Sequence, residues 1–222
     1  MGRVERVVVP GIPHHVTQRG NRKIRVFFSD KDYAMYISLL AKCCTRYEVD
    51  IWAYCLMPNH IHLIAVPQAR ESLGRAMGET HRVYALRINE REKLIGHLWQ
   101  ARFSSYPMDE KHLLAAARYI ELNPVRAGLA DNPLDWRWSS ARFHVGGRSD
   151  PLVSAGLLDG LVGDWSAFLK ERITAIDDLR KHQATGRPLG DAAFIEACEK
   201  ALGRVLRVRK RGRKPQSDQE TK

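Results

Sequence analysis

The pattern of hydrophobic and polar residues predicts alternating strands and helices over the first 123 residues. Strand-forming residues, bounded by turn residues, dominate residues 13–19, 51–57, 60–66 and 100–108. Pro58 and Asn59 form a turn pair between the second and third of these segments, which predicts a hairpin. Apolar residues recur at helical spacing in residues 30–48, 70–93 and 110–123. The stripe predicted to be buried in the first of these helices is Tyr33, Ile37, Leu40 and Cys44.

The order strand, helix, strand, strand, helix, strand predicts an α+β fold. This βαββαβ order is typical of a ferredoxin-like split unit, in which helices pack on one face of an antiparallel sheet. The helix at 110–123 closes the set, and a small helical C-terminal appendage follows it. We therefore divide the chain into a domain at 1–147, a helical DNA-binding appendage at 148–203 and a basic tail at 204–222, which is predicted to be disordered.

The amino-acid composition narrows the range of possible binding partners. The 222 residues include 36 Lys and Arg against 25 Asp and Glu, a formal net charge of +11. Such a charge attracts a polyanion, although it supports nucleic-acid binding without indicating cleavage. The four cysteines form no CxxC pair, which favours reduced thiols. No apolar run has membrane length and the N-terminal apolar stretch is too short for a signal peptide, so we expect a cytoplasmic protein with no membrane partner.

Two histidines lie on the third predicted strand, at His60 and His62. Because strand side chains alternate between faces, both rings project from the same side, with their Cα atoms about 6 to 7 Å apart. That spacing lets two imidazoles converge on one divalent ion. The alternative is a pair of polar residues, satisfied by ordinary hydrogen bonds, on a half-exposed strand.

The helix predicted at 110–123 carries a second set of polar residues. Its core-facing arc is Leu113, Ala117 and Ile120. Tyr119 and Asn123 fall four residues apart on a neighbouring stripe, so a hydroxyl and an amide stand one above the other. Taken alone, Tyr119 could be an amphipathic tyrosine at the edge of a core, and Asn123 could cap the next turn, ahead of Pro124.

Four motifs occur together and in order: HHVTQRGNR at 14–22, LMPNHIHLI at 56–64, RYIELNPVRAGL at 118–129 and WRWSSAR at 136–142. Together they resemble the REP-associated tyrosine transposases, of the single-tyrosine branch of the HUH transposases of bacterial insertion sequences. The resemblance covers roughly residues 7–147 and implies the same fold. It also implies that His60 and His62 bind a divalent metal ion, that Tyr119 is the nucleophile and that Asn123 is the third metal ligand.

The implied chemistry suits these residue types. Mg²⁺ or Mn²⁺ would polarise a phosphoryl oxygen and offset developing charge. Tyrosine is a weak nucleophile that a nearby cation and an aligned phosphate would activate. The family's reaction gives a covalent 5′-phosphotyrosine and a free 3′-OH. It needs no nucleotide cofactor, and the sequence contains no Walker-type glycine loop.

Basic residues are candidates for contacts with single-stranded or hairpin DNA. Arg22 and Arg102 are plausible phosphate contacts, and surface charge is the more ordinary interpretation. The segment 204–214 holds seven Lys or Arg in eleven residues and is expected to follow phosphates, with a solvated end as the alternative. Its predicted DNA contacts are Arg207, Arg209, Lys210, Arg211, Arg213 and Lys214.

Five further residues have competing interpretations. His14 and His15 lie on the first strand, where one of them could face the metal site. Tyr106, on the fourth strand, is a rival nucleophile. Trp136 and Trp138 are expected to pack a linker onto the core, although exposed rings could stack on unpaired bases.

The sequence therefore predicts a metal-dependent enzyme that cleaves and rejoins hairpin-containing single-stranded DNA, as a monomer or homodimer. The main alternative is a sequence-specific DNA-binding regulator that keeps the fold and catalyses no reaction. Tyr119 together with both histidines argues against it, since binding alone needs none of the three. A relaxase or replication initiator of the same class would be expected in a longer chain.

Overall fold

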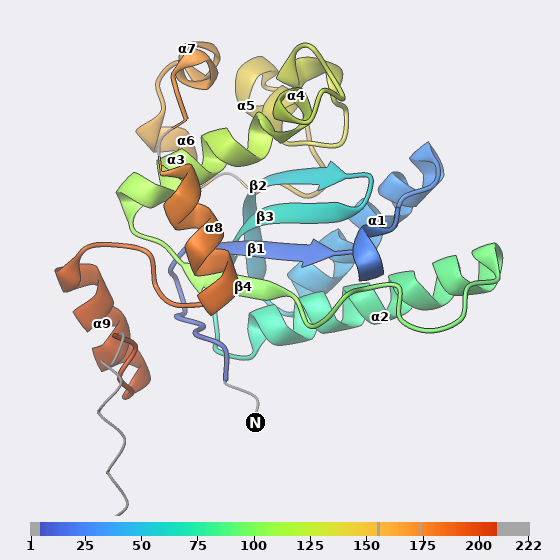
Figure 1. The fold of residues 1–222 in the computed structure, drawn as a ribbon. Helices are drawn as coiled ribbons and strands as arrows, with labels where there is room; N and C mark the ends of the chain where they lie inside the picture. Colours follow the sequence, from blue (N-terminus) through green and yellow to red (C-terminus); the bar gives the residue numbers. More distant parts are fainter. Residues whose placement is uncertain (1–4, 155, 174, 208–222) are drawn as a thin grey trace, which may run out of the picture.

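A four-stranded antiparallel sheet forms the centre of the protein (Figure 1). The computed structural model describes residues 5–154, 156–173 and 175–207. The strands are β1 (His14–Arg19), β2 (Val49–Met57), β3 (His60–Pro67) and β4 (Ser104–Pro107), and they lie in the order β2-β3-β1-β4. The central strands are therefore β1 and β3. The predicted α+β class and the predicted hairpin are confirmed.

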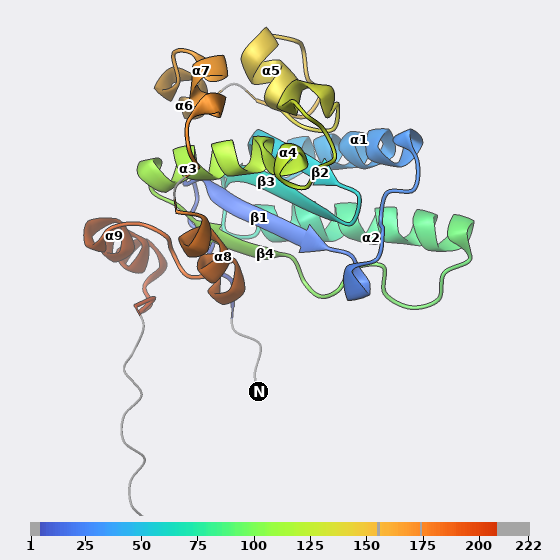
Figure 2. The same ribbon diagram turned by 45° about the horizontal axis from the view of Figure 1, so that its top comes forward.

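Helices α1 (Asp30–Arg46) and α2 (Ser72–Glu92) cover one face of the sheet (Figure 2). A capping box between Ser29 and Asp32 begins α1, so the predicted cap at Asp30 is wrong by one residue. The four residues predicted to form the buried stripe of α1 are all buried, and Tyr36 joins them in a core shared with α2 and the sheet.

The opposite face of the sheet is covered by α3 (Glu110–Glu121), which leads into the short helix α4 (Asn123–Arg126). The predicted core-facing arc of α3, Leu113, Ala117 and Ile120, is buried. These residues pack in a second hydrophobic cluster with residues of β2, β3 and the C-terminal helices. The helix that carries Tyr119 thus faces the central strands from the side that α1 and α2 leave open.

Short helices make up the C-terminal part, and α6 to α8 share the second hydrophobic cluster with α3. The patterns at 164–172, 177–182 and 191–202 correspond to three of these helices, whereas two shorter helices and two 3₁₀ turns were not predicted. The elements of this part are η2 (Pro133–Asp135), α5 (Ala141–Gly146), α6 (Leu157–Leu161), α7 (Trp165–Lys170), α8 (Ile176–Thr185) and α9 (Ala192–Leu202), and the other 3₁₀ turn, η1 (Asn21–Lys23), follows β1.

Strand β4 is shorter than the predicted segment 100–108 because its regular pairing with β1 stops at Ser104, and an isolated bridge then joins Gly20 to Trp99. The amide of Gln18 donates a hydrogen bond to the carbonyl of Ala101 at 2.8 Å, beyond the last residue of β1 that pairs with β4.

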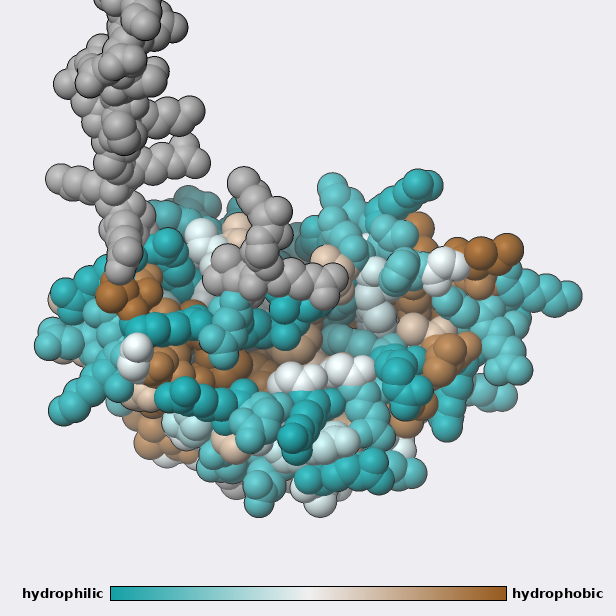
Figure 3. Space-filling model, turned by 90° about the horizontal axis from the view of Figure 1, so that it is seen from below, coloured by the Kyte–Doolittle hydropathy of each residue, from teal (hydrophilic) through white to brown (hydrophobic). Residues whose placement is uncertain are grey.

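The underside of the molecule is mostly hydrophilic, with smaller apolar patches (Figure 3). Across the described residues, no helix is both long and apolar enough to cross a membrane. Cys43, Cys44, Cys55 and Cys198 are all free and buried.

Candidate active site

His60 and His62 lie at the start of β3, immediately after the hairpin turn. Their ring centroids are 5.0 Å apart. His62 is almost fully buried, whereas His60 is partly exposed at the mouth of the hairpin. The side chains therefore share one face of the central strand, as their spacing predicted.

Tyr119 approaches these histidines from α3. Its ring centroid lies 5.7 Å from that of His62, and no described residue hydrogen-bonds its hydroxyl group. Asn123, one helical turn further on, is buried and its Nδ2 atom has no hydrogen-bond partner among the described residues. The structure thus brings Tyr119, Asn123 and the two histidines into one cavity of about 880 Å³.

The cavity is cationic. Among the described residues that line it are Arg19, Arg126 and Arg180, and none is a carboxylate. The guanidinium carbon of Arg126 lies 4.4 Å from the centre of the Tyr119 ring. Arg126 follows Tyr119 by seven residues, or two helical turns, and this spacing could have indicated the pair from sequence. The charge of the site suits a phosphate group next to the tyrosine hydroxyl.

Burial keeps both candidate ligands neutral. It lowers the pKa of His60 to about 4, with a smaller effect of the Arg19 charge. Burial also holds the pKa of His62 well below its ordinary value, with neighbouring positive charges acting in the same direction. Neutral imidazole is the form that binds a metal ion. At neutral pH these two side chains are therefore ready to act as ligands.

The donor set fits a divalent cation. His60 Nδ1 lies 2.6 Å from the Asn59 side-chain oxygen, which accepts its proton and leaves Nε2 with a lone pair. In the part of the chain that the structure describes, no group of three or more His, Cys, Asp or Glu side chains could hold a metal ion. The Asn123 amide, which lines the same cavity, is the candidate for a third ligand. Two imidazoles and an amide leave coordination positions for oxygen atoms of a substrate.

Comparison with known proteins decides the family. A family model described as "Transposase IS200 like" matches residues 9–123, more than half of the chain. The chain belongs to this family. Transposases cut and join DNA, and the resemblance inferred from the four motifs is confirmed.

Individual proteins resemble this transposase to different extents. A Haemophilus influenzae protein named as a REP-associated tyrosine transposase is 26% identical over 118 residues, which are 48% of this chain and 66% of that protein. The solved structure of a REP-associated tyrosine transposase bound to a REP hairpin matches 71% of this chain and 93% of its own, with a TM-score of 0.53 and 20% identity. This likeness shows the fold. A transposase structure from Deinococcus radiodurans R1 matches with a TM-score of 0.38 and 19% identity, over 55% of this chain and 93% of its own.

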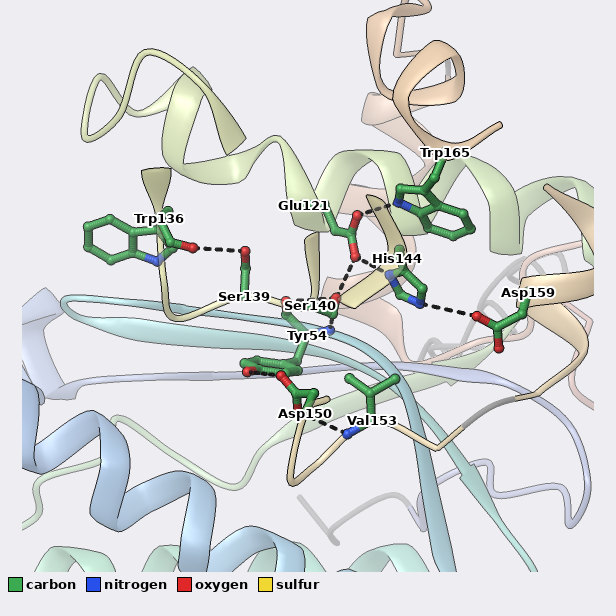
Figure 4. Close-up of polar contacts among 10 residues, drawn as sticks. All are labelled: Tyr54, Glu121, Trp136, Ser139, Ser140, His144, Asp150, Val153, Asp159 and Trp165. Atoms are coloured by element: carbon green, nitrogen blue, oxygen red, sulfur yellow. Dashed lines mark hydrogen bonds and ion pairs between the residues drawn. The ribbon is translucent and has the colours of Figure 1, made fainter. Parts of the chain in front are cut away.

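A buried carboxylate anchors the helix that carries Tyr119 (Figure 4). Glu121, two residues after Tyr119, is fully buried and accepts hydrogen bonds from Ser140 Oγ, from His144 Nδ1 at 2.6 Å and from Trp165 Nε1 at 2.7 Å. Its partners come from the loop before α5, from α5 and from α7. Sequence reasoning missed this role, although a glutamate inside an apolar helix was a usable signal.

Tyr106 does not line the cavity, and its side chain is fully buried. Its hydroxyl donates a hydrogen bond to the Leu179 carbonyl at 3.0 Å, and burial raises its pKa well above the ordinary value. This placement argues against Tyr106 as the nucleophile. His15 contacts His62, whereas His14 accepts a hydrogen bond from the backbone of Val9 and stays outside the cavity.

Both tryptophans of the WRWSSAR motif pack on the core as predicted. Trp138 stacks on Tyr33 with ring centroids 4.8 Å apart, and it is 8% exposed. Trp136 donates its indole proton to the Leu56 carbonyl at 3.0 Å. The stacked, buried ring of Trp138 is therefore not available as a flat platform for a base, whereas Trp136 is only partly buried.

The predicted DNA contacts are scattered. Arg22 is exposed in η1, at the far end of β1, and Arg102 is exposed at the edge of a second hollow. Arg207 pairs with Glu199 at 3.2 Å and with Glu196 at 3.4 Å. The other predicted contacts lie outside the described residues, namely Arg209, Lys210, Arg211, Arg213 and Lys214. All of these contacts stay predictions.

Proposed function

We propose that this transposase is a metal-dependent strand transferase that cleaves and rejoins single-stranded DNA containing a REP-like hairpin. One observation carries the proposal: a tyrosine hydroxyl that no described residue hydrogen-bonds shares a cationic cavity with two buried, neutral imidazoles. A protein that only binds DNA has no use for this combination.

The reaction begins with attack of the Tyr119 oxygen on a phosphodiester phosphorus. The Oη–P bond forms, the bond from phosphorus to the 3′ oxygen breaks, and the Tyr119 proton is released to water. The leaving 3′ oxygen gains a proton and becomes a 3′-OH. The 5′ phosphate stays covalently attached to the tyrosine, so the reverse attack by a 3′-OH rejoins the strand without a nucleotide cofactor.

The chain's own residues bind and orient the phosphate. Arg126, beside the Tyr119 ring, and Arg180 and Arg19, across the cavity, supply fixed positive charge where negative charge gathers during attack. His60, His62 and Asn123 would hold Mg²⁺ or Mn²⁺, which when bound polarises a phosphoryl oxygen.

A second hollow of about 670 Å³ extends the basic surface. It shares Ala101, Ser104, Gln183 and Ala184 with the first cavity. Among the described residues, its lining includes Arg6, Arg102, Arg187 and Arg204 against a single carboxylate, that of Glu5. Burial, and then the like charge of Arg102, lowers the pKa of Arg6 to about 10. Phosphates of a DNA strand that leaves the cavity would relieve this repulsion.

The substrate class rests on relatives. The solved structure with the same fold is that of a protein bound to a REP hairpin. The Haemophilus relative is also named for REP elements. A hairpin with single-stranded flanks is therefore the substrate to test first.

The test uses labelled hairpin single strands from the source genome, with Mn²⁺, on a denaturing gel. The proposal expects a shifted protein–DNA band for the wild type and for Tyr84→Phe, which removes a buried hydroxyl on the far side of the sheet. Tyr119→Phe should bind the hairpin and give no shifted band. Binding without cleavage by the wild type would instead favour a DNA-binding regulator.

A further inference from the structure

A buried chain of hydrogen bonds runs from His62 across three strands to a helix. His62 Nδ1 and His15 Nε2 are 2.9 Å apart, and His15 Nδ1 lies 2.7 Å from the Tyr106 hydroxyl. The hydroxyl in turn lies 3.0 Å from the carbonyl of Leu179 in α8. The three side chains are at most 2% exposed.

The sheet register places these groups on one face. His15 is paired directly with Tyr106 across β1 and β4, and Thr17, two residues after His15, is paired with His62 across β1 and β3. Side chains of paired residues, and of residues two apart on a strand, point to the same side. The backbone pairing therefore places the side chains of His62, His15 and Tyr106 next to one another on one face of the sheet.

Chemistry fixes the direction of every proton in this chain. The Leu179 carbonyl oxygen can only accept a hydrogen bond, so the Tyr106 hydroxyl donates its single proton to that oxygen. The Tyr106 oxygen then accepts from His15 Nδ1. Both histidines are buried with no carboxylate bonded to them, so each is neutral and has a single ring proton. His15 Nε2 is therefore an acceptor, and His62 carries its proton on Nδ1.

We propose that Tyr106 and His15 are positioning residues, which hold His62 in the tautomer whose unprotonated Nε2 faces the metal site. Histidine ligands usually donate their second ring proton to a carboxylate, a carbonyl group or water. Here a second histidine takes that place and connects the ligand to α8 of the C-terminal part. The inference rests on the metal site of the proposed function and adds to it two residues that need not touch DNA.

The proposal predicts what loss of the Tyr106 hydroxyl does. In Tyr106→Phe, His15 Nδ1 has no acceptor, so the His15 proton can move to Nε2. That proton then occupies the hydrogen bond to His62, which must carry its own proton on Nε2, the nitrogen that faces the metal. We expect a loss of Mn²⁺ affinity of about 10- to 100-fold.

Tyr84→Phe is the matched control. The Tyr84 hydroxyl is equally buried and also donates to a backbone carbonyl, that of Val26, at 2.8 Å, but it lies on the opposite side of the sheet. Tyr84→Phe should lower the stability of the protein about as much as Tyr106→Phe does, and it should leave Mn²⁺ affinity unchanged. The difference between the two variants isolates the connection to His62 from a general effect of losing a buried hydrogen bond.

Two measurements test the proposal. Nitrogen NMR of the histidine rings in the metal-free wild type should show His62 and His15 protonated on Nδ1, and this result needs no variant to fold. Titration with Mn²⁺, followed by electron paramagnetic resonance, should rank Tyr106→Phe well below both the wild type and Tyr84→Phe. A wild-type His62 protonated on Nε2, or equal affinities of the two variants, would overturn the proposal. If both measurements come out as expected and the wild type still cleaves no DNA, strand transfer fails while the positioning role stands.

Discussion

Replacing Glu121 by alanine should remove the anchor of the helix that carries Tyr119. The carboxylate is fully buried and accepts three hydrogen bonds, from Ser140, His144 and Trp165. The Ser140 hydroxyl also contacts the Tyr54 carbonyl, so it keeps a partner, whereas the indole and imidazole donors lose theirs. Each buried donor left without a partner costs about 1 to 3 kcal/mol. Breaking a buried, hydrogen-bonded pair costs about 3 to 5 kcal/mol, so we expect the free energy of unfolding to fall by about 4 kcal/mol.

Glu196→Ala is the control for this change. Glu196 also forms an ion pair, with Arg207, but the side chains are 75% and 52% exposed, and such pairs contribute roughly 0 to 1 kcal/mol. For a chain of this size 1 kcal/mol corresponds to about 2 to 4 °C in Tm. Thermal unfolding followed by circular dichroism should therefore separate the two variants by about 6 °C or more. Equal Tm values for the two would refute the reasoning that this buried network fixes α3.

Three further outcomes follow from the site and the surface. His60→Ala and His62→Ala should each abolish cleavage and Mn²⁺ binding measured by calorimetry, because each removes one of two imidazole ligands; full activity in excess chelator would contradict this. Deleting residues 208–222 should flatten the salt dependence of DNA binding by roughly 0.7 log units per lost phosphate contact and leave cleavage at saturating DNA intact; an unchanged slope would make the segment a solvated end. The free energy of unfolding should fall as the pH drops from 7 to 5.5. Below about pH 6.5 several histidines bind protons in the unfolded chain, whereas in the folded chain their lowered pKa values keep them neutral. The expected loss is about 1 kcal/mol per histidine, and a urea midpoint that does not move would contradict it. The histidines with lowered pKa values include His14 (about 4), His15 (about 3), His60 (about 4) and His81 (about 3).

Local sequence patterns predicted what depends on neighbours along the chain. The two-residue period of β3 put His60 and His62 on one face, and the helical period of α3 put Tyr119 and Asn123 on one stripe. The motif resemblance then brought the two elements together. The apolar arc of α3 also proved to be buried.

Contacts between distant segments could not be predicted in this way. The partners of Glu121 lie 19 to 44 residues further along the chain, and the contact of His15 with His62 depends on how β1 pairs with β3. A single sequence shows that His15 is on a strand but leaves open which neighbour it meets. The length of β4 was overestimated for the same reason, because the regular pairing with β1 stops at Ser104 and returns only as an isolated bridge between Gly20 and Trp99.

The most direct test of the central claim is to locate the covalent bond to DNA. Wild-type protein is incubated with excess hairpin substrate and Mn²⁺, digested with nuclease and protease, and analysed by mass spectrometry. Strand transfer by the proposed route predicts a nucleotide attached through its 5′ phosphate to the peptide that contains Tyr119. An adduct on a different residue, or cleavage with no adduct, would contradict it.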